Sequence, residues 1–316
     1  MKLKRITQIA FALVFCMAAT SANAADPKFL RIGTASLGGN YFPMGAAIAT
    51  IIDKQVPGGF RATAQASSGS AYNMTAIQDG EQELAICQGP AVTDAMAGGK
   101  TPDVRTIANY NATPQHILVR NAANIKSVAD FKGKKMELIA AGDGVEVSTR
   151  KMLAAFGIKW EDIKPEYSGN RVQAASRLKT GQMDAIIDAT GTGSAWITDI
   201  IGDGSKFSLL PLSDAEIDKV LAANKEFSRM PIPANAYRGQ NKDVNAVGVW
   251  TVVVVSKNLS DELVYNITKQ MFANAQFLKE RHNYFKDLAP GNIVGAVVAP
   301  LHPGAEKYYK ETGILQ

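Results

Sequence analysis

The chain has 316 residues, 46% of them hydrophobic, with 34 basic and 29 acidic side chains. This length allows a large buried core and indicates about two domains. The basic residues form no cluster of the kind that binds nucleic acid or an anionic membrane surface, which argues against both as main partners.

The first 24 residues have the pattern of a secretory signal peptide. Two lysines and an arginine open it, an apolar stretch follows at 9–19, and Ala22-Asn23-Ala24 has the small-x-small form of a cleavage site. The apolar stretch is shorter than the roughly 20 residues that a membrane span needs. Removing the three leader charges from the 34 leaves 31 basic against 29 acidic residues. We therefore expect a nearly neutral protein that is exported to the periplasm and begins near Ala25.

The cysteines exclude an internal disulfide. One of the two lies in the predicted leader, and only Cys87 remains in the mature chain. Stability after export must then come from the burial of apolar side chains. Cys87 follows an apolar run at 84–86, which favours a small buried side chain over the alternative of a catalytic thiol.

One order of patterns recurs along the mature sequence. A short apolar run precedes a loop of glycines and small hydroxylated residues, and then a helical pattern, at 30–39, 60–70, 136–144 and 185–193. In an open α/β sheet such loops leave the carboxyl ends of parallel strands and lead into helix N-termini. The free N–H groups and positive dipole ends of these helices attract small anions. Several such loops directed at one crevice would form a binding site.

The periodicity predicts two β-loop-α series. The first has strands at 30–34, 60–66 and 83–88 and helices at 41–56, 70–79 and 91–97. The second has strands at 115–120, 136–140 and 185–188 and a helix at 148–156. A β-branched strand at 247–256 and one long amphipathic helix at 261–281 follow. This order predicts an α/β fold, with a parallel or mixed sheet covered by helices.

The return of the chain on a late strand predicts two lobes with a hinge. The hinge would consist of strands near 115–120 and 249–255, with a cleft in front of it. The first lobe would then comprise residues 25–115 and 250–316, and the second lobe residues 116–249.

Four stretches of the sequence resemble one known family. They are LRIGTASLGGNYFPMG at 30–45, the Ser68-Gly69-Ser70 loop with Asn73, Gln88 with Asp94-Ala95, and the ending from Leu301-His302-Pro303-Gly304-Ala305 to 308–313. In this order, and over nearly the whole mature chain, the sequence resembles the TAXI family, the extracytoplasmic solute receptors of tripartite TRAP transporters.

The resemblance implies a type II periplasmic-binding-protein fold, with two α/β lobes joined by a two-stranded hinge. It also implies a small organic acid or amino acid as ligand, such as glutamate or 2-oxoglutarate, and an ion-driven TRAP membrane permease as partner. Two alternatives stay open: a receptor for an ABC transporter or a sensor kinase, and an exported enzyme on the same fold. The three histidines lie far apart, and the glycine loops lack a dinucleotide or phosphate fingerprint. We therefore expect a monomeric binding protein without cofactor or metal.

The candidate ligand contacts of the first lobe are Gly39, Asn40, Tyr41, Ser68, Ser70, Asn73 and Gln88. The first three would offer backbone N–H groups and a phenol to a ligand carboxylate, or the glycines would form only a tight turn. The two serines would donate hydroxyls to the ligand or cap the next helix. The two amides can donate and accept, either in a cleft or in a buried polar network.

The candidates of the second lobe are Gly144, Thr190, Thr192 and Tyr237. The threonines would donate hydroxyls or remain solvated, and the tyrosine would cover the cleft or pack on it. Asp143 and Glu146 have the spacing of a capping box, and the alternative is a carboxylate that pairs with a ligand ammonium and so favours an amino acid. A ligand that contacts both lobes would shift the hinge equilibrium toward closure.

Overall fold

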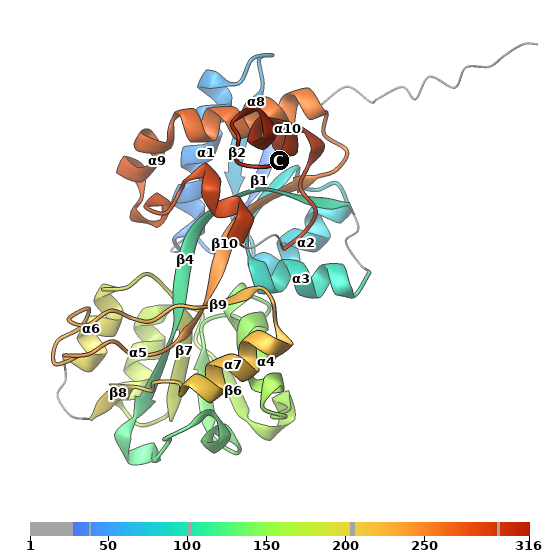
Figure 1. Ribbon diagram of the computed structural model, residues 1–316. Coiled ribbons are helices and arrows are strands. Elements are labelled where there is room, and N and C mark those ends of the chain that lie inside the picture. The colour runs from blue at the N-terminus through green and yellow to red at the C-terminus, as the bar shows by residue number, and fades with distance from the viewer. Residues whose placement is uncertain (1–27, 38, 100–102, 203–205, 296–297) are drawn as a thin grey trace, which may run out of the picture.

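The computed structural model describes residues 28–37, 39–99, 103–202, 206–295 and 298–316. The predicted leader and Gly38 lie outside the described residues. Within these ranges, no helix combines the length and the apolar character needed to cross a lipid bilayer. Figure 1 shows two α/β halves, one above the other, connected by the long strands β4 (Val104–Arg120) and β10 (Val247–Ser256).

The upper half is built on three parallel strands. β1 (Phe29–Gly33) pairs with β2 (Arg61–Gln65) and β3 (Leu84–Gln88), and β10 then joins β3 in antiparallel orientation. The helices between these strands are α1 (Tyr41–Gln55), α2 (Ser70–Gln78) and α3 (Gly89–Ala97). In α1, Met44, Ile48 and Ile52 recur at helical spacing and are fully buried, so this face holds the helix on the sheet.

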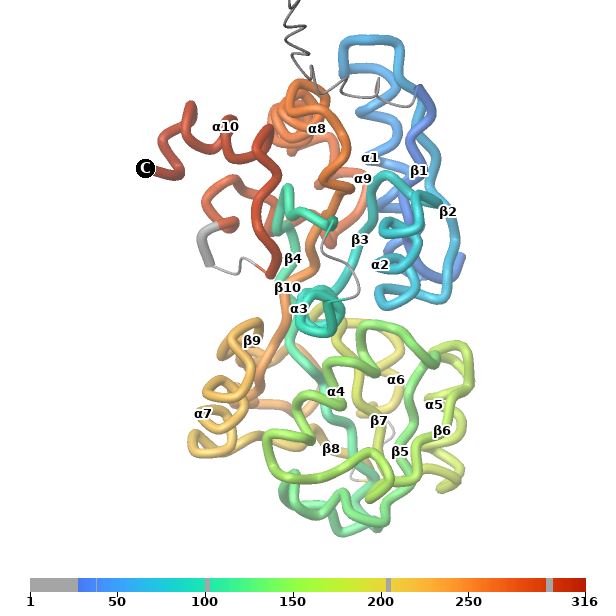
Figure 2. Tube along the Cα trace, turned by 90° about the vertical axis from the view of Figure 1, so that its right-hand side faces the viewer, coloured from blue at the N-terminus to red at the C-terminus, as the bar shows by residue number. Residues whose placement is uncertain are grey.

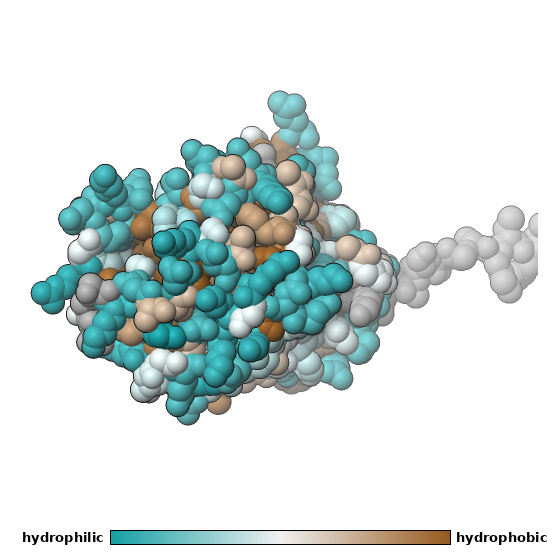
Figure 3. All heavy atoms as spheres, turned by 90° about the horizontal axis from the view of Figure 1, so that it is seen from below, coloured by the Kyte–Doolittle hydropathy of each residue, from teal (hydrophilic) through white to brown (hydrophobic). Residues whose placement is uncertain are grey.

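The lower half repeats the order around the other end of β4. The sheet continues from β4 through β7 (Ala185–Ala189) and β5 (Lys135–Leu138) to β6 (Lys164–Tyr167). Two short strands, β8 (Phe207–Leu209) and β9 (Phe227–Arg229), pair with β4 and β10. The helices are α4 (Gly144–Ala155), α5 (Arg171–Lys179), α6 (Ala195–Ile201) and α7 (Asp214–Ala223). Seen from below, this half presents a mainly hydrophilic surface with small apolar areas (Figure 3).

After β10 the chain returns to the upper half. It forms α8 (Asp261–Ala273), α9 (Ala275–Arg281) and α10 (Pro303–Glu311). The prediction of one long helix at 261–281 is wrong, because Asn274 leaves the helical conformation at φ −106° and ψ 25°. The Asn274 Nδ2 group donates to the carbonyl of Gln270 at 2.8 Å and so satisfies the end of α8. The described residues also contain five short 3₁₀ segments, at Asn121–Ala123, Val128–Phe131, Trp160–Asp162, Asn283–Phe285 and Pro290–Gly295.

The strands β4 and β10 run side by side between the halves (Figure 2). The predicted strand at 115–120 is only the end of β4, which starts at Val104. Buried polar residues, among them Asn109 and Asn111, hid the first part of this strand from its hydrophobic pattern. The predicted lobe boundaries fall inside these strands, and the division itself stays a prediction.

Two bulges interrupt the pairing of these strands. Val253 pairs with Ala108 and Val254 with Thr106, so Ile107 is the extra residue and its carbonyl needs another donor. The hydroxyl of buried Tyr309, in α10, donates to that carbonyl at 2.7 Å. α10 therefore stabilises the irregular part of the long strand.

Replacement of Tyr309 with phenylalanine should lower the free energy of unfolding by about 1–3 kcal/mol, because a buried carbonyl is left without a donor. Tyr308, its half-buried neighbour, makes no such bond in the described part of the chain. Tyr308→Phe should therefore change stability by less than about 0.5 kcal/mol. Urea unfolding followed by circular dichroism measures both, and equal losses would contradict the role of the Tyr309 hydroxyl.

Candidate ligand-binding site

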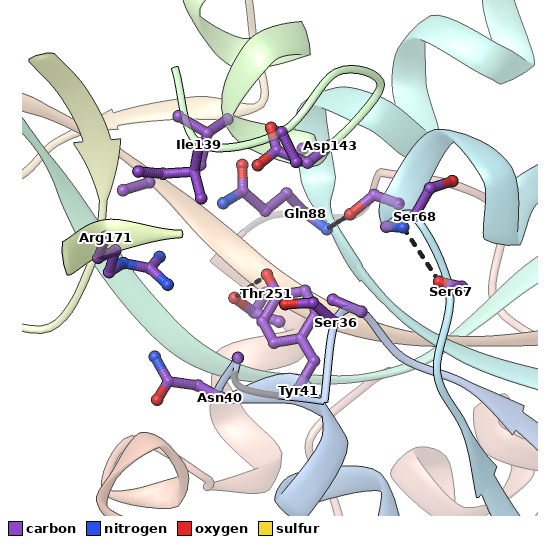
Figure 4. A pocket seen from close by; sticks show the side chains of 18 of the residues that line it. Ser36, Asn40, Tyr41, Ser67, Ser68, Gln88, Ile139, Asp143, Arg171 and Thr251 are labelled. Carbon is purple, nitrogen blue, oxygen red and sulfur yellow. Dashed lines mark hydrogen bonds between the residues drawn. The ribbon is translucent and has the colours of Figure 1, made fainter. Parts of the chain in front are cut away.

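A cavity of about 130 Å³ lies between the two halves, in front of β4 and β10. Thr113 of β4 and Thr251 of β10 line its floor. Since on the order of 10–15 Å³ of such space holds one water molecule, the cavity has room for a small organic molecule. Figure 4 shows Asn40 and Tyr41 reaching it from the upper half and Asp143 and Arg171 from the lower half.

Five helices begin at this cavity. In each of them the first helical residue or the residue before it lines the cavity; these residues are Tyr41 in α1, Ser70 in α2, Gln88 before α3, Gly144 in α4 and Arg171 in α5. The first N–H groups of a helix have no partner inside the helix, and its N-terminus carries about half a positive charge. The arrangement is therefore a concentrated source of hydrogen-bond donors and positive potential.

The structure brings seven of the predicted site residues to this cavity: Gly39, Asn40, Tyr41, Ser68, Ser70, Gln88 and Gly144. Tyr41 Oη lies 3.2 Å from Thr251 Oγ1, and burial raises the pKa of Tyr41, which keeps the phenol protonated. Ser70 Oγ accepts from the backbone N–H of Gln88 at 3.1 Å, so it fixes the end of β3 rather than capping α2.

The other four predicted residues do not line the cavity. Asn73 is buried and its Nδ2 donates to the carbonyls of Thr34 at 2.7 Å and Ile86 at 3.3 Å, so it ties two strand ends together. Thr192 lies in a separate hollow with Trp250. Thr190 and Tyr237 take part in other polar contacts.

Thr190 and Tyr237 form hydrogen bonds with residues other than a ligand and are not among the cavity-lining residues. Thr190 Oγ1 lies 2.8 Å from the Tyr284 hydroxyl, which also accepts from Gly191 N–H at 3.0 Å. The Tyr237 hydroxyl accepts from Gly193 N–H at 3.2 Å and lies 2.8 Å from Nε2 of buried His116. Burial lowers the pKa of His116 to about 4, so this imidazole is neutral near pH 7.

The structure shows the capping role of Asp143 and places the residue at the cavity, and its contact with a ligand ammonium stays a prediction. Its Oδ1 accepts from Glu146 N–H at 2.8 Å, which caps α4, and the residue also lines the cavity. Burial raises the pKa of Asp143 to about 7. Glu146 accepts instead from Gly142 N–H at 2.8 Å and pairs with Arg150, so it is not among the cavity-lining residues.

Sequence reasoning missed Arg171, the cation of this cavity. Its Nε and Nη2 groups donate to the two carboxylate oxygens of Asp188, at 2.7 Å and 3.2 Å. Asp188 is fully buried and raises the pKa of the guanidinium. Nε and Nη2 are used in this pair, whereas Nη1 is not. The loop Ser168-Gly169-Asn170 before Arg171 has the same small-residue pattern that marked the other loops and could have identified it.

Two observations bear on the alternatives of a catalytic thiol and a metal site. Cys87 is fully buried, and burial raises the pKa of its thiol to about 12, which opposes the thiolate that a nucleophile requires. Over the ranges that the structure describes, no three His, Cys, Asp or Glu side chains come together in a metal-binding arrangement.

Several solved structures share this fold. PhnD1 from Prochlorococcus marinus, in complex with methylphosphonate, has 12% identity and a TM-score of 0.55, with 92% of this chain and 100% of that chain covered. XAC2383 from Xanthomonas citri, bound to chloride ion, has 11% identity and a TM-score of 0.55, with 91% and 98% covered. A putative L-cystine ABC transporter protein from Listeria monocytogenes has 15% identity and a TM-score of 0.51, with 83% and 99% covered. These similarities confirm the predicted type II periplasmic-binding-protein fold.

The family model that matches the chain is that of the NMT1-like family, over residues 32–313. This match corrects the resemblance to the TAXI family, and with it the TRAP permease and the dicarboxylate ligand that the resemblance implied. The His-Pro-Gly-Ala motif behind that resemblance marks the start of α10, where the His302 side chain accepts from Gly304 N–H. Since the match spans most of its length, the chain belongs to the NMT1-like family.

Proposed function

We propose that this protein is an extracytoplasmic receptor that closes on one small organic oxyanion and delivers it to an ABC-type permease. The observation that carries the proposal is the convergence of five helix N-termini, from both halves, on one cavity that also holds Arg171. The sequence pattern of a cleaved leader supports a place outside the cytoplasmic membrane.

The electrostatics of the cavity favour an anion. Arg171 and Asp188 form a pair of opposite charges, so the attraction for an anion comes from the helix ends, at about half a charge each, and an ionised Asp143 offsets part of it. The backbone N–H groups of these helix ends can surround an oxyanion without the desolvation that a free lysine or arginine would undergo. The free part of the Arg171 guanidinium would add a charge-assisted hydrogen bond.

Contacts between the halves support closure as the mechanism. Thr93, in α3, donates to Glu226 of the lower half at 2.9 Å, and Lys151 of α4 pairs with the same carboxylate at 2.8 Å. Tyr284, after α9, bonds Thr190 across the cleft. A ligand held by groups from both halves would add to these contacts only in the closed form, and so would shift the equilibrium toward it.

Two structurally similar proteins support an oxyanion as the ligand and an ABC transporter as the partner. PhnD1 is in complex with methylphosphonate, and the Listeria protein is described as part of an ABC transporter. Transport of this type should be blocked by orthovanadate, which inhibits ATP hydrolysis, and should survive dissipation of ion gradients. Uptake of the radiolabelled ligand by intact cells tests this; the reverse pattern would exclude an ABC permease.

Thermal unfolding of the mature chain tests the binding proposal. Methylphosphonate, ethanesulfonate and acetate are compared with the neutral molecules dimethyl methylphosphonate and ethanesulfonamide. At 100 times its dissociation constant a bound oxyanion should add about 2.7 kcal/mol to stability, which raises the midpoint by several degrees, whereas the neutral molecules should have no effect. Equal shifts with neutral and anionic members would contradict the proposal.

A further inference from the structure

Two hydrogen-bond acceptors lie together at one side of the cavity and lack donors. Gln88 is only 5% exposed, and its Oε1 has no hydrogen-bond partner in the described part of the chain. Asp143 uses Oδ1 to cap α4, and no described group donates to its second oxygen. Figure 4 shows the two side chains next to each other, with Arg171 at a distance from them in the same cavity.

The backbone holds these acceptors close together. A Cβ atom placed on Gly144, the residue after Asp143, would lie 2.8 Å from Cβ of Gln88, so the two loops are in contact. The acceptors come from different halves, since Gln88 ends β3 and Asp143 precedes α4. A donor bound between them would therefore join the halves.

A ligand that carries only an oxyanion would leave the acceptor atoms of Gln88 and Asp143 without hydrogen-bond donors. A buried acceptor without a donor is unfavourable, and a second negative charge near Asp143 would add repulsion. Burial raises the pKa of Asp143 to about 7, although the Glu146 N–H donates to Oδ1, so the ionised carboxylate is unfavourable here without a further partner. A cationic N–H group at this position would satisfy Gln88 and stabilise the ionised carboxylate.

We propose that the ligand is a zwitterion, with an ammonium group received by Asp143 and Gln88 and an oxyanion received by Arg171 and the helix N-termini. This inference rests on the proposed function, because it assumes an oxyanion in the same cavity. The shared chemistry is an aminoalkyl oxyanion, in which the acidic group is a phosphonate, a sulfonate or a carboxylate.

Titration calorimetry at pH 8 with matched pairs tests the inference. The pairs are 2-aminoethylphosphonate with ethylphosphonate, 2-aminoethanesulfonate with ethanesulfonate, and β-alanine with propionate. In at least one pair, the amino compound should bind about 10- to 100-fold more tightly than its partner. The pair with the tightest amino member identifies the acidic group.

Variants test whether Asp143 and Gln88 cause the tighter binding of the amino compounds. Asp143→Asn keeps a good helix cap, and it should weaken the amino compound about 10- to 100-fold while the plain anion binds at least as well as before. Gln88→Met keeps the volume without the acceptor and should weaken the amino compound about 3- to 10-fold. Asp214→Asn, at an exposed aspartate that pairs with Arg229, is the matched control and should change neither.

The outcomes separate the two proposals. Equal or tighter binding of the plain anions, with full affinity retained in Asp143→Asn, overturns the ammonium site and leaves the oxyanion receptor intact. If no member of any pair binds, the proposed function fails as well. Thermal unfolding of each variant verifies that it is folded, and Gln88→Met provides the test if Asp143→Asn does not fold.

Discussion

Replacement of Arg171 with glutamine is expected to weaken oxyanion binding by about 100-fold. Its guanidinium is held by Asp188 through two hydrogen bonds, and the residue lines the cavity. Truncation of one partner of a buried charged hydrogen bond costs about 2–5 kcal/mol in affinity, and the helix N-termini that remain should retain part of the binding. Titration calorimetry with the best oxyanion measures the loss.

The single variant also leaves the fully buried Asp188 without its cation. Breaking a buried ion pair in this way destabilises a protein by about 3–5 kcal/mol, so weaker binding alone could reflect poorer folding. The double variant Arg171→Gln with Asp188→Asn replaces the ion pair by two neutral amides. It should recover most of the lost free energy of unfolding while its affinity stays low. Recovery of affinity together with stability would show that Arg171 acts only through the fold.

The strands and helices that follow a clear apolar period could be predicted from the sequence. The β-branched run at 247–256 is the clearest case, since β10 (Val247–Ser256) has the predicted bounds. The first part of β4 could not be predicted, because Asn109 and Asn111 interrupt its hydrophobic pattern. These polar residues are buried where β4 pairs with β10. Likewise, α5 buries only Ala174, Ala175 and Leu178, which is too weak a pattern to reveal a helix.

The site could be predicted where backbone geometry determines it. Loops that leave parallel strands and enter helices meet at one edge of a sheet, and Asn40, Ser68 and Gln88 do lie beside one cavity, while their contact with a ligand stays a prediction. Side-chain contacts between segments that are far apart in the chain leave no comparable pattern in the sequence. Tyr41 meets Thr251, 210 residues away, and Thr190 meets Tyr284, 94 residues away. Thr190 was therefore expected at the ligand, whereas its hydroxyl joins the two halves.

Replacement of Gly144 with alanine is expected to weaken ligand binding by about 10- to 100-fold without destabilising the free protein. The added Cβ would lie 2.8 Å from Cβ and Cγ of Gln88, closer than carbon atoms can approach. Overpacking of this kind costs about 1–3 kcal/mol, and here it can be relieved by opening the halves. Because Gly144 opens α4 and its φ is not positive, alanine suits the backbone and should stabilise the open form slightly.

Two measurements distinguish blocked closure from a damaged site. Small-angle X-ray scattering should show that saturating ligand makes the native chain more compact and leaves Gly144→Ala expanded. Gly291→Ala is the matched control, because a Cβ atom there meets nothing within 4 Å, and its affinity should be unchanged. If Gly144→Ala binds as tightly as the native chain, the contact between its loop and Gln88 is not part of the ligand-bound state. Gln88 and Asp143 would then not receive one ammonium group together, which would also contradict the proposed ammonium site.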